Sequence, residues 1–315
     1  MHALVTGGAG FIGSTLTDRL LADGHRVTVL DNFSSGSHDN LTGARDEHGD
    51  RLAVIEADVR DTGVSDQVRD AAPEVLFHLA AQADVRVSVA EPAFDAAVNI
   101  VGSLNVIEGA RLGGARKVVF ASSGGTIYGD PDPSALPVDE SHPREPVSPY
   151  GVAKMVVGQY LEAFRVLHGL DYTALALANV YGPRQDPHGE AGVVAIFAGR
   201  LLAGEPCTIF GSGEQTRDFV YVDDVVDAFA RAADAAPGQL LNIGTGEETS
   251  VNRLYRAMAD AAGVDAEPVM AEPRVGELAR SALNRAKATA ALGWSPAVTL
   301  DGGVARVLDW FRARP

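Results

Sequence analysis

The feature of this chain that most limits its fold is a glycine-rich turn between a strand and a helix, at the start of the sequence. Residues 2–6 form a short apolar run, Gly7-Gly-Ala-Gly-Phe-Ile-Gly13 follows at once, and Leu16, Leu20 and Leu21 then recur at helical spacing. Glycines here let the backbone turn tightly, approach a pyrophosphate and pack the helix on the strand, and the helix N-terminus supplies N–H donors. The segment predicts the first unit of a dinucleotide-binding sheet.

A second apolar run, Arg26–Leu30, is followed by Asp31, about 20 residues after the glycines. A carboxylate at this position accepts hydrogen bonds from both ribose hydroxyls of a dinucleotide and repels a 2′-phosphate. The plainer interpretation is a solvated aspartate after an ordinary turn, and the combination of strand, spacing and acid argues against it. The sequence therefore predicts NAD as the cofactor, in preference to NADP.

Strand-like and helical runs alternate further along the chain. The apolar segments that suggest strands are Leu52–Ile55, Val75–Leu79, Lys117–Ala121 and Tyr172–Leu177. Alternating βα units predict an α/β fold, a Rossmann-type doubly wound parallel sheet that binds ligands at the carboxyl ends of its strands. Small or polar residues stand at those ends: Asp58, which could accept from an adenine amino group, then Leu79-Ala80-Ala81 and Ser122-Ser-Gly-Gly-Thr126.

The pattern loosens from Val180 onwards. Residues 180–190 are rich in Gly, Pro and polar groups, which is typical of a functional loop or a domain crossing. We then expect a helix at Val193–Leu202, strands at Phe219–Val222 and Leu240–Ile243, Asp223 and Asp224 as helix caps, and helices separated by prolines from Ser250. This predicts a Rossmann domain at residues 1–179, with later returns near 219–245, and a smaller interleaved C-terminal α/β substrate lobe at 180–315.

Composition excludes several classes of function. The 315 residues are 46% hydrophobic, which supports a well-buried core, and we find no signal peptide and no apolar run long enough for a membrane span. A net charge of −16 argues against nucleic-acid or anionic-membrane partners. The single cysteine, Cys207, lies in an apolar run and fits a core thiol in a reducing cytoplasm. The eight histidines are scattered, so we predict no metal.

The candidate catalytic pair is Tyr150 and Lys154, four residues apart in a segment that reads as helix. At this spacing both side chains project from one face. A lysine charge about 6 Å from the phenol, at an effective dielectric constant of about 20, would lower its pKa by about two units. The pattern therefore predicts a tyrosine that acts as a general base. A chance pair on a helix surface is the alternative, and the surrounding strand-end pattern argues against it.

These residues carry a family resemblance over essentially the whole chain. The chain resembles the extended short-chain dehydrogenase/reductases and, within them, the UDP-glucose 4-epimerases. The matching segments are Thr6-Gly-Gly-Ala-Gly-Phe-Ile-Gly13, Leu30-Asp-Asn-Phe33, His78-Leu-Ala-Ala81, Asn99, Ser122-Ser-Gly-Gly-Thr-Ile-Tyr-Gly129, Ser148-Pro-Tyr-Gly-Val-Ala-Lys154, Asn179-Val-Tyr-Gly-Pro-Arg184, Arg217-Asp-Phe-Val220 and Asn242-Ile-Gly-Thr-Gly246.

The resemblance implies two sets of binding residues. For NAD they are Gly7, Gly10, Phe11, Ile12, Gly13, Asp31, Asn32, Asp58, Val59, Leu79, Ala80, Ala81, Asn99, Tyr150 and Lys154. For the nucleotide sugar they are Asn179, Arg217, Arg274 and Glu277, the arginines being suited to a diphosphate. Ser281, seven residues after Arg274, is implied beside the sugar 2-substituent, where a serine would leave room for an acetamido group. The resemblance also implies a homodimer formed through two helices of each subunit.

The implied chemistry is epimerisation at C4 of a UDP-hexose through a transient 4-keto sugar. Tyr150 takes the proton of the 4-hydroxyl, and Lys154 lowers the pKa of Tyr150 and holds the nicotinamide ribose. The chain departs from the family pattern at Gly124, where a serine or threonine is usual. Thr126 or Ser123 must then donate to the reacting oxygen, and we favour Thr126 narrowly.

Other functions compete with this one. UDP-N-acetylglucosamine and UDP-glucuronate are alternative substrates for the same reaction. A nucleotide-sugar 4,6-dehydratase or decarboxylase would need an acid beside the threonine, and Gly124-Gly125-Thr126 holds none. A non-catalytic NAD-binding module would typically lack the tyrosine or the lysine, and both are present.

Overall fold

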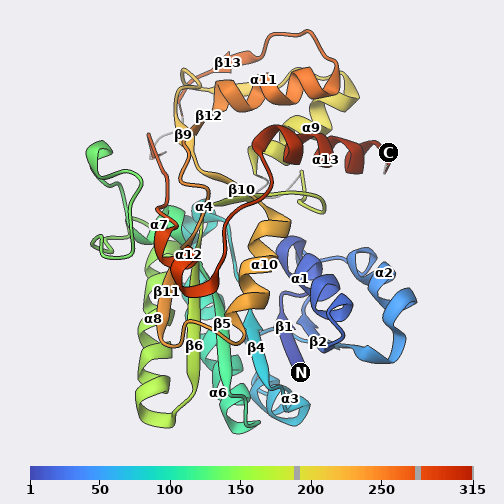
Figure 1. Ribbon diagram of the computed structural model, residues 1–315, viewed down its shortest axis with the longest axis vertical. Coiled ribbons are helices and arrows are strands. Elements are labelled where there is room, and N and C mark those ends of the chain that lie inside the picture. Colours follow the sequence, from blue (N-terminus) through green and yellow to red (C-terminus); the bar gives the residue numbers. More distant parts are fainter. Residues whose placement is uncertain (188–191, 274–277, 314–315) are drawn as a thin grey trace.

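The computed structural model of the protein describes residues 1–187, 192–273 and 278–313, in two lobes (Figure 1). The larger lobe is built on a sheet of parallel strands in the order β11 (Gln239–Ile243), β6 (Asp171–Leu177), β5 (Lys117–Ser123), β4 (Val75–His78), β1 (His2–Thr6), β2 (Arg26–Asp31) and β3 (Leu52–Glu56). The order reverses between β1 and β4, which creates the crevice where ligands of such sheets bind. The expected Rossmann-type fold is therefore confirmed.

Each central strand is apolar on both faces, because both faces are covered by helices. Leu4, Leu30 and Leu76 point into a core shared with α3 (Val64–Ala71), α6 (Ser103–Leu112) and α8 (Pro149–His168). Val5 and Phe77, one residue further along their strands, point into the opposite core with α1 (Phe11–Ala22) and α10 (Val222–Ala232). Successive side chains alternate between the faces of a strand, so continuous apolar runs suit a sheet covered on both sides.

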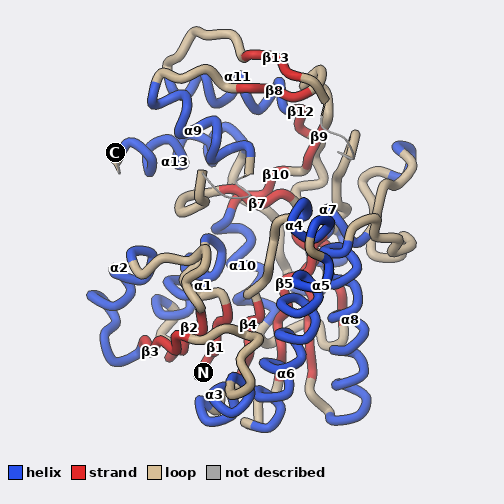
Figure 2. Tube along the Cα trace, turned by 180° about the vertical axis from the view of Figure 1, so that it is seen from behind, coloured by secondary structure: helices blue, strands red, loops and turns tan. Residues whose placement is uncertain are grey.

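One long helical stretch carries an irregular turn beside the crevice. α5 (Pro92–Ala96) continues into a π-helical turn at Ala97–Gly102 and then into α6, and all three lie next to α8 (Figure 2). Such a turn inserts an extra residue into the helix, and π-turns are frequent at functional sites. Asn99 lies in this turn and Asp95 lies in α5 just before it, and both are buried.

The smaller lobe sits beyond the carboxyl ends of the sheet, at the opposite end from the N-terminus (Figure 1). Three two-stranded sheets belong to this part of the molecule: β7 (Asn179–Tyr181) with β10 (Phe219–Tyr221), β9 (Thr216–Arg217) with β12 (Thr249–Ser250), and β8 (Thr208–Phe210) with β13 (Val269–Ala271). Its helices are α9 (Val193–Ala203), α11 (Val251–Ala262) and α13 (Leu300–Arg312), while α12 (Ala286–Leu292) returns beside β11. The remaining short elements are α2 (Asp39–His48), α4 (Val85–Ala90), α7 (Gly124–Ile127), and the 3₁₀ turns Gly49–Arg51 and Pro133–Ala135.

One cap prediction was wrong. α10 begins at Val222 with Tyr221 as its N-cap, so Asp223 and Asp224 lie in its first turn. Asp224 instead accepts hydrogen bonds from the backbone N–H groups of Ala297 and Val298, both at 3.0 Å. Its carboxylate therefore joins α10 to the segment that precedes α13.

Within the described ranges, no helix combines the length and the apolar character that crossing a membrane requires. The same residues contain no cluster of His, Cys, Asp or Glu that could hold a metal ion. Cys207 is buried, and burial raises the pKa of its thiol, as expected for a core residue.

Candidate active site

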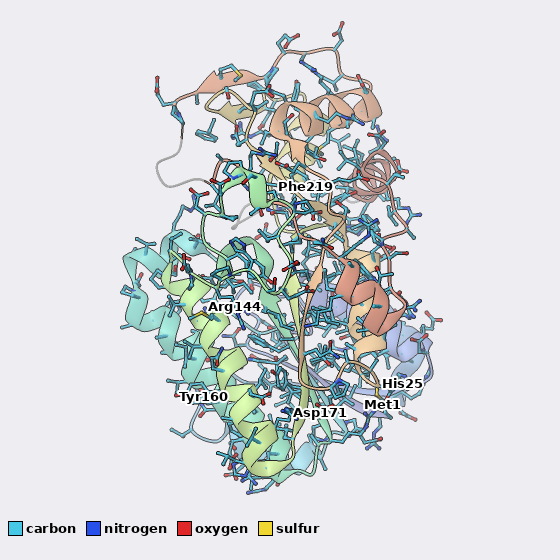
Figure 3. All side chains as sticks on the ribbon, turned by 60° about the vertical axis from the view of Figure 1, so that its left-hand side comes forward. Met1, His25, Arg144, Tyr160, Asp171 and Phe219 are labelled. Atoms are coloured by element: carbon cyan, nitrogen blue, oxygen red, sulfur yellow. The ribbon has the colours of Figure 1, made fainter. Side chains whose placement is uncertain are left out.

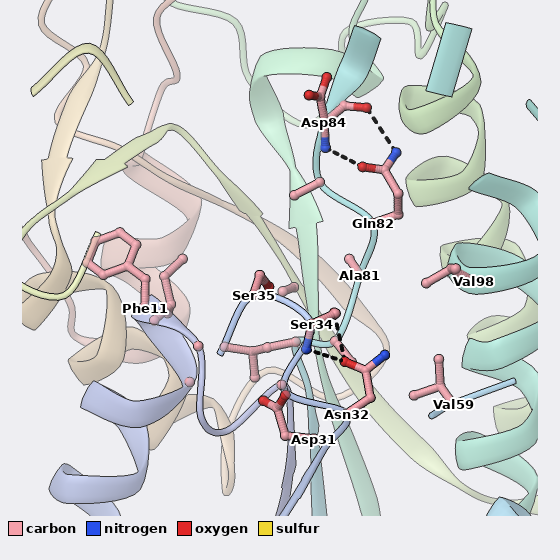
Figure 4. A pocket seen from close by; sticks show the side chains of 18 of the residues that line it. Phe11, Asp31, Asn32, Ser34, Ser35, Val59, Ala81, Gln82, Asp84 and Val98 are labelled. Carbon is pink, nitrogen blue, oxygen red and sulfur yellow. Dashed lines mark hydrogen bonds between the residues drawn. The ribbon is translucent and has the colours of Figure 1, made fainter. Parts of the chain in front are cut away.

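A cavity of about 610 Å³ lies at the reversal point of the sheet, in the size range of cofactor sites. It brings together most residues expected to bind NAD, together with the catalytic candidates Ser123, Tyr150 and Lys154; Figure 4 shows part of its wall. The predicted residues that line it are Gly7, Gly10, Phe11, Ile12, Gly13, Asp31, Asn32, Asp58, Val59, Leu79, Ala80, Ala81, Ser123, Tyr150 and Lys154. Thr126 and Asn99 are not among the lining residues.

The glycine turn closes one side of this cavity. Gly7 has a φ of 68°, and a Cβ on it would lie 2.9 Å from the backbone nitrogen of Ala80, so only glycine fits. At Gly10 the only atom near a Cβ would be the carbonyl oxygen of Gly7, at 3.3 Å. A group can therefore approach the backbone closely at Gly10, beside the N-terminus of α1.

Asp31 is held in place by backbone donors. Its two oxygens accept hydrogen bonds from Ala9 N at 2.9 Å and Phe33 N at 2.8 Å. Each carboxylate oxygen keeps a second lone pair, which suits it to accept from ribose hydroxyls.

Asp58 lies at the next strand end with a partner that the sequence did not suggest. Arg60 donates to both of its oxygens, each at 2.8 Å, and Asn32 donates to its Oδ2 at 2.8 Å. The hydrogen bonds from Arg60 hold the pKa of the Asp58 carboxyl well below its usual range. Arg60 also lies over the ring of Phe94 at 5.2 Å, and both residues line the cavity.

Tyr150 and Lys154 come from the first turns of α8. Ser148 caps this helix by accepting from Gly151 N at 3.2 Å, and Pro149 occupies its first position. Lys154 Nζ donates to the carbonyl oxygen of Ala121 at 2.9 Å and lies 5.7 Å from the centre of the Tyr150 ring.

The expected lowering of the Tyr150 pKa is not found in this structure. Burial raises the pKa of Tyr150 to about 12, hydrogen bonding from the Ser123 hydroxyl lowers it, and the charge of Asp95 raises it. Burial lowers the pKa of Lys154 to about 8. Desolvation of the phenol therefore outweighs the lysine field that we expected from helical spacing alone.

The hydroxyl that is hydrogen-bonded to the Tyr150 side chain belongs to Ser123. Ser123 lines the cavity, whereas the hydroxyl of Thr126 lies one turn further along α7, 3.5 Å from the Ser123 carbonyl oxygen. The structure also explains why Gly124 replaces the usual serine or threonine. A Cβ on Gly124 would collide with the side chain of Leu283, a buried residue of the C-terminal segment.

A directed hydrogen-bond chain supports the loop after β4. Ser103 Oγ donates to the carbonyl oxygen of Asn99 at 2.6 Å, so it must accept from His78 Nε2 at 2.8 Å. His78 Nδ1 then accepts from Thr6 Oγ1 at 2.7 Å, and Thr6 Oγ1 accepts from the backbone of Leu79 and Ala80. Burial lowers the pKa of His78 to about 3, so the imidazole stays neutral.

The structure brings three of the expected sugar-nucleotide residues to one place. Asn179 of β7 pairs with Phe219 of β10, and Arg217 lies two residues before Phe219. The segment that contains Ser281 runs beside residues 216–218. Thr216 N donates to Ala279 O at 3.0 Å, and Leu283 N donates to the buried Asp218 at 3.2 Å. Arg274 and Glu277 lie outside the described residues.

Sequence reasoning missed several residues of this site. Gln82 continues the strand-end stretch that includes Ala81, so extending the motif by one residue would have found it. Arg60 stands two residues after Asp58, so the local sequence could have suggested it as a partner of that carboxylate. Phe94, which lines the cavity, and Leu283, which packs beside Gly124, carried no local signal, because they belong to segments distant in sequence. Additional lining residues are Leu30, Ser34, Ser35, Ala57, Ala83, Asp84, Val98, Ala121, Ser122, Leu177, Ala178 and Val180.

The geometry suits proton transfer at a carbinol next to a bound dinucleotide. A phenol, a hydroxyl and an ammonium lie at one part of the cavity wall, while the glycine turn and Asp31 lie at another. The phenol can exchange a proton with a substrate oxygen, and the hydroxyl can donate to the same oxygen.

Comparison with known proteins agrees with this geometry. A model of the NAD dependent epimerase/dehydratase family matches residues 3–244. The UDP-glucose 4-epimerase of Mycolicibacterium smegmatis is 52% identical over 313 residues, covering 99% of each chain. The crystal structure of a Thermotoga maritima UDP-glucose 4-epimerase with UDP-glucose is similar, with a TM-score of 0.95, 46% identity and 99% of each chain covered. That of a Thermus thermophilus UDP-glucose 4-epimerase complexed with NAD has a TM-score of 0.92 and 42% identity over all of both chains.

Proposed function

The chain belongs to the NAD-dependent epimerase/dehydratase family, and on this basis we propose that it interconverts UDP-glucose and UDP-galactose by inverting C4. The observation that carries the proposal is the meeting of Tyr150, Ser123 and Lys154 at one cavity wall. The run Gly124-Gly125-Thr126 supplies no carboxylate beside them, so the acid that a dehydratase needs at this position is missing.

The cavity fits NAD in its residues as well as its volume. The open approach at Gly10 and the N–H groups at the start of α1 suit the pyrophosphate. Asp31 would accept from the adenosine ribose, and its charge disfavours a 2′-phosphate, since the nearby Arg60 is already paired with Asp58. Asn32 and Asp58 would meet the adenine edge. NAD held there would supply the acceptor, and then the donor, of the hydride exchanged with C4 of the sugar.

The residues of the chain handle the proton and the orientation of the sugar. Tyr150 takes the proton from the 4-hydroxyl as the carbonyl forms, and returns it when the carbonyl is reduced on its other face. Ser123 donates a hydrogen bond to the same oxygen, and Lys154 supplies a positive charge beside the phenol. Asn179 and Arg217 would hold the nucleotide diphosphate, so that the keto-hexose can turn without leaving.

The test is an assay of the purified protein with UDP-galactose, followed by chromatography or NMR, without and then with added NAD. We expect UDP-glucose to form, and we expect Tyr150→Phe to abolish most of this turnover. Failure to interconvert the two sugars, even with added NAD, would refute the proposal. The same assay with the N-acetylated pair and with UDP-glucuronate defines the substrate range.

We also propose that the protein is a homodimer formed through α6 and α8. Val152, Tyr160 and Leu167 are exposed and lie along one side of α8 at helical spacing. Val101 and Leu112 are exposed on the neighbouring stretch, and Tyr160 is labelled in Figure 3. Exposed apolar patches of this kind mark protein–protein contacts.

The dimer proposal is tested by light scattering after gel filtration. Tyr160→Glu should give a monomer, and Val269→Glu, which changes an exposed apolar residue of β13, should leave the dimer intact. A monomeric wild-type protein would contradict the proposal. A cytoplasmic location remains a prediction from cysteine content and the nucleotide-sugar substrate.

A further inference from the structure

Asp95 is a buried carboxylate that makes no salt bridge with any residue the structure describes. It lies on α5, is only 1% exposed, and its Oδ1 accepts from Gln82 Nε2 at 3.0 Å and Asn99 Nδ2 at 2.8 Å. Both donors are neutral amides. A carboxylate buried with neutral partners alone is costly to keep ionised, so its ionised form depends on a positive charge nearby.

Lys154 is likewise a buried charged group whose hydrogen bond goes to a neutral partner. Its ammonium donates to the carbonyl oxygen of Ala121. α5 packs against α8, so these two buried groups lie on neighbouring helices. Burial raises the pKa of Asp95 and lowers that of Lys154; against this, the charge of each group favours the charged form of the other. The other titratable groups around this pair are Tyr150 and His78, of which His78 is neutral.

The amides that bind Asp95 are fixed by their own hydrogen bonds. Asn99 Oδ1 accepts from Gln82 N at 2.9 Å, so the Nδ2 group of Asn99 must face Asp95. Gln82 Oε1 accepts from Asp84 N, and Gln82 Nε2 donates to Asp84 O at 2.9 Å, as Figure 4 shows. The donors therefore point at the carboxylate, an arrangement that suits its ionised form. The π-helical turn containing Asn99 brings this amide within reach of Asp95, one turn before it.

We infer that Asp95 is a positioning residue for the proposed epimerisation, and that it serves as the buried counter-charge that keeps Lys154 protonated. It does not touch the substrate; it acts through Lys154 and through the loop that Gln82 and Asn99 hold against the cavity. The role of Asp95 in turnover rests on the proposed function. Its effect on the charge of Lys154 does not depend on that function and can be measured in the protein alone.

Loss of the Asp95 charge should shift the titrations of Lys154 and Tyr150 in one direction. A lysine with a pKa of about 8 loses its charge as pH rises through that value. Without the negative charge of Asp95 this loss occurs at lower pH. The same negative charge raises the pKa of Tyr150, so its removal moves the titration of the phenol to lower pH as well. Removing Asp95's charge thus shifts both limbs of the pH–rate profile in the acid direction.

Asp95→Asn is the sharpest variant, because the amide oxygen can still accept from Gln82 and Asn99. Glu108→Gln is the matched control: it removes one negative charge from the adjoining α6, where Glu108 pairs with Arg111 at the surface. We expect both limbs of the kcat profile to move by about one pH unit in Asp95→Asn and to stay in place in Glu108→Gln. Thermal unfolding and bound NAD should be close to wild type in both.

A titration of Lys154 by NMR, with isotope-labelled lysine and without substrate, separates the inference from the proposed function. A shift to lower pH in Asp95→Asn supports the counter-charge even if no epimerase activity is found. Unchanged titration, or a drop in kcat at every pH without a shift, overturns it. If Asp95→Asn does not fold, the carboxyl of Asp95 can be titrated in the wild-type protein, where protonation at neutral pH would equally overturn the inference.

Discussion

Removal of the Ser123 hydroxyl should impair catalysis far more than removal of the Thr126 hydroxyl. Ser123 lines the cavity and lowers the pKa of Tyr150, whereas Thr126 makes a long hydrogen bond of 3.5 Å to a backbone carbonyl. Losing a hydrogen bond to a group that becomes charged costs about 1.5–3 kcal/mol. Ser123→Ala should therefore lower kcat by roughly 10- to 150-fold. Thr126→Val, which keeps the shape of the side chain, should change it by less than about threefold.

The assay is the rate of UDP-galactose conversion from pH 5 to the highest pH at which the protein stays folded, with bound NAD measured after denaturation as a check on the site. The direction of the pH effect adds a second criterion. In the protein without sugar, the Ser123 hydroxyl lowers the pKa of Tyr150, so its loss should raise that pKa and move the acid limb of the kcat/KM profile to higher pH. Near-normal turnover in Ser123→Ala with a large loss in Thr126→Val would refute this reasoning and return the role to Thr126.

Four further results are expected. Tyr150→Phe should keep its fold and its NAD but lose at least roughly 10²-fold in epimerisation, and near-normal turnover would exclude Tyr150 as the base. Acid-denatured wild-type protein should release NAD; mainly NADP would show that Asp31 is misassigned. Gly124→Ala should lower the free energy of unfolding in urea by about 1–3 kcal/mol, because the new Cβ would meet Leu283. Adding Leu283→Ala should relieve part of that cost; if the costs of the two changes simply add, the contact is contradicted. Wild-type protein should convert UDP-N-acetylglucosamine, and Ser281→Tyr should lose this activity while retaining UDP-glucose conversion; no wild-type conversion would count against an open pocket at Ser281.

Local patterns allowed much of the site to be predicted. The glycines before α1, the acid at the end of β2 and the small residues after β4 all line the cavity, because each position follows from the end of a strand. Strand ends can be read from a few consecutive residues, and parallel strands bring their ends to one edge of the sheet. The spacing of Tyr150 and Lys154 likewise follows from helix geometry.

The protonation behaviour of that pair could not be read in the same way. Spacing on a helix places two side chains near each other, but it does not give their burial. Tyr150 and Lys154 are both enclosed by segments distant in sequence, and desolvation raises one pKa and lowers the other. Helical spacing therefore led us to expect a lowered pKa for the Tyr150 phenol, whereas its burial raises that pKa.

The sequence by itself determined the fold class, the cofactor and the position of the Tyr–Lys pair, since these depend on strand, turn and helix signals within about 20 residues. Only the tertiary structure decided that the Ser123 hydroxyl is hydrogen-bonded to Tyr150, and that Leu283, from the far end of the chain, fills the space beside Gly124. It also decided that the buried Asp95 and Lys154 lie on neighbouring helices, α5 and α8. The physical reason is that packing and electrostatic coupling depend on which segments meet in space, and no periodicity within one segment records its partner.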